Sequence, residues 1–205
     1  SMVSLKAAEV GATDGAPRIF LSDPVKLKMV RDRIRSGSHA YDGSMKDLRE
    51  DADQALKAGP FSVMHKKTAP PSSDKHDYMS QGLYWWPDPA KPDGKPYLNR
   101  DGQINPETKE LSDDREMRAM ATAAKTLALY YYLSGEEKYA ARAALLLRTW
   151  YLDPETRMNP HFNYAQGIPG RNEGRYSGIV DGEHQVGMPD AIGMLAGSPS
   201  WSQTD

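Results

Sequence analysis

The chain has 205 residues, of which 39% are hydrophobic and 26% are charged, and its formal net charge is -2. This balance is typical of a globular protein of one or two domains, and it argues against a nucleic-acid or anionic-membrane partner. The absence of cysteine excludes disulfides, thiolate metal sites and a cysteine nucleophile, and no apolar run approaches the roughly 20 residues of a membrane span.

The first 17 residues are expected to lie outside the folded domain. Ser1-Met2 resembles a cloning remnant ahead of a start site, and residues 7–17 are rich in small residues, which is typical of a flexible leader. The N-terminus lacks the basic-then-apolar pattern of a signal peptide. We therefore expect the domain to span residues 18–205.

Two helices are predicted in the first third of the chain, and we expect them to pack as a pair. Ser22-Asp23-Pro24 places a capping side chain before a proline at the first helical position, which is a strong helix start. A second helix is predicted from Ser44 to about Ala58, with apolar residues at helical spacing and Gly59-Pro60 at its end.

Residues 60–112 contain prolines, glycines and aromatic residues, and no period of 2 or 3.6 persists. A segment of this length without regular structure is uncommon in a compact domain unless it is functional or disordered. Its tryptophans and tyrosines argue against disorder. We therefore predict an ordered, functional loop.

The strongest helical signal follows this loop. Ser112-Asp113-Asp114 suits a helix N-terminus, and apolar residues then recur at i, i+3, i+4 and i+7 until Ser134-Gly135. A second helix begins at Glu136-Glu137. Two long antiparallel helices joined by a two-residue turn form an αα-hairpin.

The C-terminal quarter is less regular. Residues 159–177 are predicted to be a loop, and Asp181–Leu195 is predicted to be a weaker helix that Pro189 interrupts. No strand alternation of convincing length is present. The predicted fold class is therefore all-α, built from helical hairpins with long loops.

Two loop segments carry the residues suited to chemistry. Lys75–Pro89 contains tyrosines and two adjacent tryptophans, and aromatic rings stack on sugar rings. The alternative is that Trp85 and Trp86 pin this loop to the core. Asn159–Arg175 gathers a histidine, a tyrosine, two arginines and several carboxamides, although asparagine, glycine and proline are also ordinary turn residues.

A third group is interpreted as structural. Asp181, Glu183 and His184 superficially resemble a metal cluster, but their spacing matches no known site. An acid at a helix start beside a solvated histidine is the favoured interpretation. No metal site is predicted, and no P-loop, dinucleotide fingerprint or nucleophile elbow is present.

The two loop segments resemble the alginate-lyase superfamily of bacterial polysaccharide lyases. The resembling stretches are Tyr78–Pro89, Pro96–Gly102 with Asn105-Pro106-Glu107, and Asn159–Arg175, within a likeness that covers residues 18–201. The resemblance implies an α/α toroid of helical hairpins around a cleft. It also implies cleavage of a 1,4-linked uronate polymer, such as alginate or glucuronan, by β-elimination without a metal or organic cofactor.

The resemblance also implies roles for individual residues. Tyr164 and His161 are expected to transfer protons, and Arg171 is expected to neutralise the substrate carboxylate, for which a guanidinium is well suited. The residues expected to bind the substrate are Tyr78, Tyr84, Trp85, Trp86, Asn163, Gln166 and Arg175.

The chain also departs from the family pattern. The family continues into a second helical half with an Asn-Asn-His segment and a further catalytic tyrosine, and neither is present here. Gly197-Ser198-Pro199 also looks like a helix cap with no helix behind it. We therefore expect the N-terminal part of a toroid, with hairpin faces exposed for self-association.

Further expectations concern where and how the protein acts. The resemblance implies a periplasmic or secreted protein whose partner is an acidic polysaccharide. The alternatives to a lyase are a non-catalytic module that binds acidic polysaccharides and a protein-interaction domain whose aromatic loop docks another protein.

Overall fold

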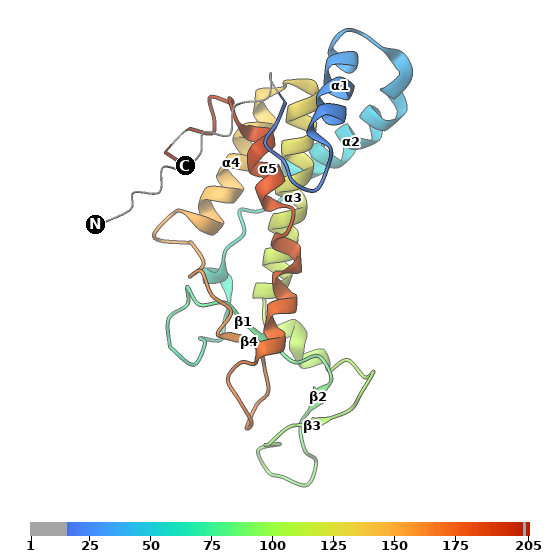
Figure 1. Ribbon diagram of the computed structural model, residues 1–205. Helices are drawn as coiled ribbons and strands as arrows, with labels where there is room; N and C mark the ends of the chain where they lie inside the picture. Colours follow the sequence, from blue (N-terminus) through green and yellow to red (C-terminus); the bar gives the residue numbers. More distant parts are fainter. Residues whose placement is uncertain (1–15, 203) are drawn as a thin grey trace, which may run out of the picture.

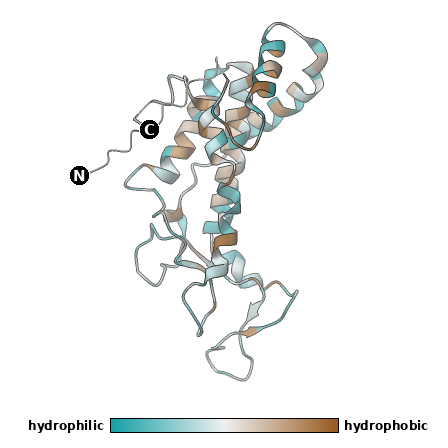
Figure 2. Ribbon diagram, in the orientation of Figure 1, coloured by the Kyte–Doolittle hydropathy of each residue, from teal (hydrophilic) through white to brown (hydrophobic). Residues whose placement is uncertain are grey.

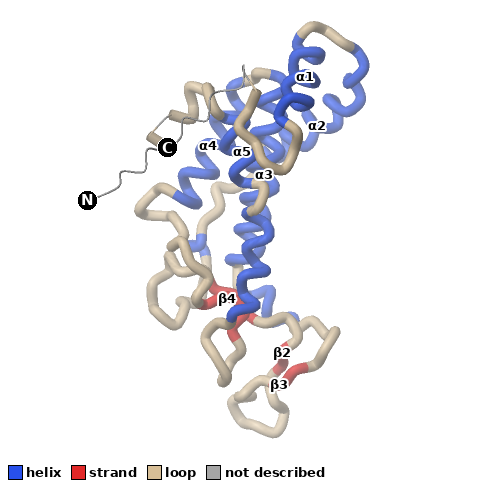
Figure 3. The backbone as a smooth tube through the Cα atoms, in the orientation of Figure 1, coloured by secondary structure: helices blue, strands red, loops and turns tan. Residues whose placement is uncertain are grey.

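The structure of the protein is a computed structural model that describes residues 16–202 and 204–205, so most of the predicted leader lies outside the described residues. The fold is mostly helical. Helices gather at one end of the molecule, whereas loops and short strands form the other end (Figure 3). The longest helix, α3 (Asp113–Ser134), connects the two ends (Figure 1).

The predicted αα-hairpin is confirmed. Helix α3 ends at Gly135, which adopts a left-handed conformation with φ 80° and donates its N–H to the Tyr131 carbonyl at 2.7 Å. Helix α4 (Glu137–Tyr151) then returns along α3. Fully buried side chains of the two helices form the centre of the core: Met117, Met120, Leu127, Leu146, Leu147 and Trp150.

The first two helices differ from the prediction in their packing. Asp23 caps α1 (Pro24–Arg35) as predicted, because its carboxylate accepts the backbone N–H groups of the first turn. A 3-10 turn, η1 (His39–Tyr41), precedes α2 (Asp42–Ala55), which begins earlier than predicted. Both helices pack mainly against α3 rather than as a pair with each other, and α1 has no buried residue.

The predicted C-terminal helix consists of two elements. The 3-10 helix η4 (Tyr176–Gln185) is followed by the α-helix α5 (Met188–Leu195). Pro189 therefore does not interrupt a helix, since it lies in the first turn of α5, where a missing N–H costs no helical hydrogen bond. Both elements pack along α3.

Short strands pair within and between the loops. The predicted all-α class did not include these strands. Strand β1 (Met79–Gln81) pairs in parallel with β4 (Tyr164–Gly167), and β2 (Trp85–Trp86) pairs antiparallel with β3 (Leu98–Asn99). Strands of two to four residues are too short to show alternation. Two 3-10 turns complete the loops, η2 (Val63–His65) and η3 (Pro106–Glu110).

Hydrophobic residues are concentrated in the helical end, and polar residues predominate in the loops (Figure 2). Within the described residues, no helix combines the length and the apolar character needed to cross a membrane.

Gly193 allows the segment before α1 to cross α5. A β-carbon at this position would overlap the carbonyl oxygen of Arg18. Asp190 on the same helix holds the crossing segment, because its carboxylate accepts the backbone N–H groups of Phe20 and Leu21. We expect Gly193→Ala to lower the free energy of unfolding by about 1–3 kcal/mol, because backbone must move to admit the methyl group.

Gly43 provides the matched control for this prediction. It is the second residue of α2, with no atom within 4 Å of an added β-carbon. Gly43→Ala should therefore stabilise the protein by about 0.5–1 kcal/mol through helix propensity. Urea denaturation of the two variants measures both effects, and equal stabilities would show that the crossing at Gly193 is not tight.

Candidate functional site

The two loop segments meet where β1 pairs with β4. Met79 lies opposite Tyr164, and Gln81 lies opposite Gly167. An advance of two residues along β1 therefore matches an advance of three residues along β4. The extra residue forms a bulge at Gln166, whose φ of 55° is uncommon for a residue other than glycine. Because of the bulge, Tyr164 and Gln166 line different cavities.

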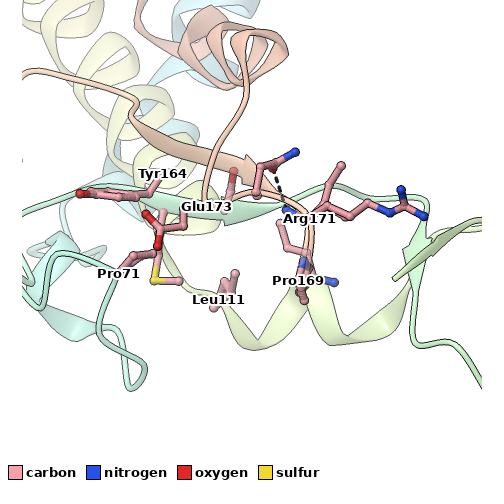
Figure 4. Close-up of a pocket in the computed structure, with 13 residues that line it drawn as sticks. Pro71, Leu111, Tyr164, Pro169, Arg171 and Glu173 are labelled. Atoms are coloured by element: carbon pink, nitrogen blue, oxygen red, sulfur yellow. Dashed lines mark hydrogen bonds between the residues drawn. The ribbon is translucent and has the colours of Figure 1, made fainter. Parts of the chain in front are cut away.

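The first cavity, of about 410 Å³, is bordered by both strands and by the turn after Gly167 (Figure 4). Tyr164, Pro71 and Glu173 lie at one end, and Arg171 lies at the other. Among the described residues, none forms a hydrogen bond with the Tyr164 hydroxyl. This phenol is therefore available to a ligand.

The second cavity, of about 710 Å³, shares Ser80, Gln81 and Leu111 with the first. It lies between β1, the start of α3 and η4. Its polar lining also includes Lys109, Asp114, Arg115, Arg118, Gln166, Asp181, Glu183 and His184.

Asp181 joins the two strands to η4. Its carboxylate accepts hydrogen bonds from the Tyr78 hydroxyl at 2.9 Å, the Ser80 hydroxyl at 2.5 Å and the Gln166 side-chain amide at 2.7 Å. The amide oxygen of Gln166 in turn accepts from Arg175 at 3.2 Å. Both ends of the Gln166 amide are thus oriented, as buried polar groups require.

Asp181 was not predicted as a site residue. The interpretation as an acid at a helix start is wrong, because the residue lies inside η4 and is 6% exposed. No local pattern marks it, since its strand partner Ser80 is 101 residues away.

Removal of the Asp181 charge should weaken this junction. In Asp181→Asn the new NH2 group replaces an oxygen that accepts from Gln166 or from the two hydroxyls, so we expect a loss of about 1.5–3 kcal/mol in the free energy of unfolding. Glu183→Gln is the control on the same helix, because the Glu183 side chain is 74% exposed. Urea titration followed by circular dichroism measures the difference, and equal midpoints would contradict a structural role for the Asp181 carboxylate.

Tyr78 does not fit its predicted contact with substrate. The residue has no exposed surface, and its ring packs edge-on against Phe162 with the centroids 5.0 Å apart. Burial raises the pKa of the hydroxyl well above its usual value. Tyr78 is therefore a core residue that orients Asp181.

The segment 82–105 forms an arm that carries the other predicted aromatic residues. The Trp86 indole donates to the Gln103 carbonyl at 2.8 Å, and Arg100 lies over its ring at 5.2 Å. Tyr84 is 37% exposed. The indole of Trp86 thus holds the arm together rather than pinning it to the core, while Tyr84 presents an exposed aromatic surface.

The two arginines predicted at the site, Arg171 and Arg175, both contact the protein itself. Arg171 stacks over Trp85 at 5.1 Å, and its Nε donates to the Tyr97 carbonyl at 2.7 Å. It is an exposed residue, and its side chain points away from the end of the cavity that holds Tyr164 (Figure 4). Arg171 thereby ties the second loop to the arm, whereas Arg175 orients Gln166.

His161 lies outside both cavities. Its Nε2 is 3.0 Å from the buried Asp77 carboxylate, which also accepts from Ser72 and Asn159. Burial alone would raise the pKa of Asp77, but these donors and the histidine hold it below its usual value.

The His161 and Tyr164 rings are neighbours with centroids 6.4 Å apart. Asn163, the remaining predicted contact, is exposed beside them.

The described residues contain no group of three or more histidine, aspartate or glutamate side chains that could hold a metal.

Comparison with known proteins assigns the chain to a family. No curated protein sequence matches the chain. The sequence model of the alginate lyase family matches residues 62–205. The crystal structure of an alginate lyase from Bacteroides ovatus superposes with a TM-score of 0.84 at 44% identity, over 92% of this chain and 49% of the other. The chain thus spans about half the length of that enzyme, and it belongs to the alginate lyase family.

Proposed function

We propose that this chain is the N-terminal part of an α/α-toroid polysaccharide lyase that cleaves a 1,4-linked uronate polymer, alginate or glucuronan, by β-elimination. Family membership supports the reaction class, and the observation that carries the assignment is the unpartnered Tyr164 hydroxyl in a cavity between the two loop segments. We also propose a periplasmic or secreted location, on the basis of family membership.

The proposed chemistry needs three groups around one sugar. Donors neutralise the C6 carboxylate, a base removes the C5 proton, and an acid protonates the departing O4 as the C4–C5 double bond forms. Tyr164 is the proposed proton-transfer residue, and Tyr84 supplies an aromatic surface for a sugar ring. Arg171 contributes its terminal nitrogens, since Tyr97 and Trp85 engage only its Nε and one face.

The test is the ultraviolet absorbance of the unsaturated uronate product after incubation with alginate, polymannuronate and glucuronan. This chain and a version extended through its full reading frame should be compared. Product from either chain on at least one polymer is the expected result. No product from the extended chain on any of the three would overturn the proposal.

A non-catalytic binding module is the second candidate, and it is favoured by the exposed ring of Tyr84, since an aromatic ring can bind a sugar without cleaving it. A module of this kind would bind uronate oligomers and release no unsaturated product. Binding that Tyr84→Ala abolishes, with no product even from the extended chain, would favour the module over the lyase.

A further inference from the structure

The second cavity contains a histidine that neither loop segment supplies. Helix η4 is a 3-10 helix, in which residues three apart share a face. Gly178, Asp181 and His184 therefore lie in a row. A β-carbon on Gly178 would be 2.6 Å from that of Ala165, and Asp181 is buried under β1 and β4. His184 ends the row at the point where the face opens into the cavity.

The His184 ring is positioned without being hydrogen-bonded. Its side chain is 17% exposed, and its Nε2 lies 3.8 Å from both the Asp114 and the Glu183 carboxylates. This distance is beyond hydrogen-bonding range. In the part of the chain that the structure describes, no hydrogen bond joins this ring to the protein. His161 differs, because Asp77 already occupies its Nε2.

The surrounding charges permit an acidic ligand. Asp114 is paired with Arg118 at 3.1 Å, and Asp181 is saturated by its three donors. The side-chain amide of Gln166 uses one of its two hydrogens for Asp181, so the second remains for a ligand. The other charged groups that line the cavity are Lys109, Arg115 and Glu183.

We infer that His184, and not His161, is the histidine that hydrogen-bonds a second acidic sugar of the polymer, next to the sugar at Tyr164, with the carboxylate of this second sugar seated in the second cavity. This inference rests on the proposed function and assigns a subsite to it. The volume of about 710 Å³ suits a ligand of sugar size, since small-molecule sites measure about 300–1,000 Å³. The Gln166 amide then serves as the second donor.

The test is titration of the chain with a mannuronate tetrasaccharide, followed through the imidazole signals of the two histidines by nuclear magnetic resonance. The His184 signals should shift and those of His161 should stay. His184→Ala should raise Kd about tenfold, the change expected for one lost hydrogen bond to a charged group. His161→Ala is the matched control, with Kd unchanged and a lower Tm from the loss of the Asp77 contact.

The outcomes separate the inference from the proposed function. Saturable binding that moves only the His161 signals, or that His184→Ala leaves intact, would overturn the inference and leave the lyase proposal standing. A wild-type chain, alone and extended, that binds no uronate oligomer and forms no product would overturn both. Circular dichroism of each variant confirms that the fold is retained.

Discussion

Lys66→Met is expected to lower the free energy of unfolding by about 3–5 kcal/mol, the range measured when one partner of a buried ion pair is removed. The Lys66 side chain is 1% exposed, and its ammonium group lies 2.8 Å from the Asp113 carboxylate, which has no exposure at all. It also donates to the carbonyls of Lys75 and Asp77 at 2.7 and 2.5 Å. Burial lowers the pKa of Lys66 and raises that of Asp113, so each group depends on the other to stay charged.

The loss should be large because Asp113 has few other partners. One of its carboxylate oxygens accepts the Met79 N–H at 2.9 Å, and the other has no hydrogen-bond partner among the described residues. Without Lys66 this charge would be buried and uncompensated. The double variant Lys66→Met/Asp113→Leu should therefore recover part of the stability that the single variant loses.

Urea denaturation is the measurement, and Lys67→Met is the control, since this neighbouring lysine is exposed. The control should stay within about 0.5 kcal/mol of the wild type. If Lys66→Met lowers the free energy of unfolding by less than about 1 kcal/mol, the Lys66–Asp113 ion pair does not fix β1 to the start of α3.

The elements that the sequence predicted well are those specified by neighbouring residues. The αα-hairpin follows from apolar periodicity and from Gly135, whose left-handed conformation only a glycine adopts without strain. The α1 boundary follows from Asp23, which caps the helix directly before its proline. Each of these signals lies within one helical turn of the structure that it determines.

The parts of the site that could not be predicted depend on distant contacts. Asp181 and Lys66 look like ordinary surface residues in the sequence, and they become central because Ser80, Tyr78 and Asp113 are brought to them by the fold. Hydrogen bonds between residues far apart in sequence leave no periodic trace. The burial of Tyr78 was missed for the same reason.

The bulge at Gln166 is a further example. Gln166 was predicted as a substrate contact from the resemblance alone, and nothing in its neighbours indicates a left-handed glutamine. The strained conformation persists because Asp181, Ser80 and Arg175 bind the residue through its amide groups. Strain of this kind is concentrated at functional sites, where the surrounding structure over-determines it.

Tyr164→Phe should lower kcat by about 10²–10⁴-fold if Tyr164 transfers the proton, which is the usual contribution of a positioned acid or base. The ring would remain, so its packing at the end of the first cavity and its contact with the His161 ring at 6.4 Å would persist. Since no described residue hydrogen-bonds the hydroxyl, stability should stay within about 0.5 kcal/mol. KM should change little, because the loss falls on the transition state.

The rate of unsaturated uronate formation by the active chain measures this effect, with Tyr176→Phe as the control. Tyr176 is 96% exposed on η4 and lines neither the first nor the second cavity, so its variant should match the wild type. A Tyr164→Phe enzyme with full kcat would remove Tyr164 from the chemistry. The proton-transfer group would then have to be sought in the second cavity, where His184 and Gln166 face the same space.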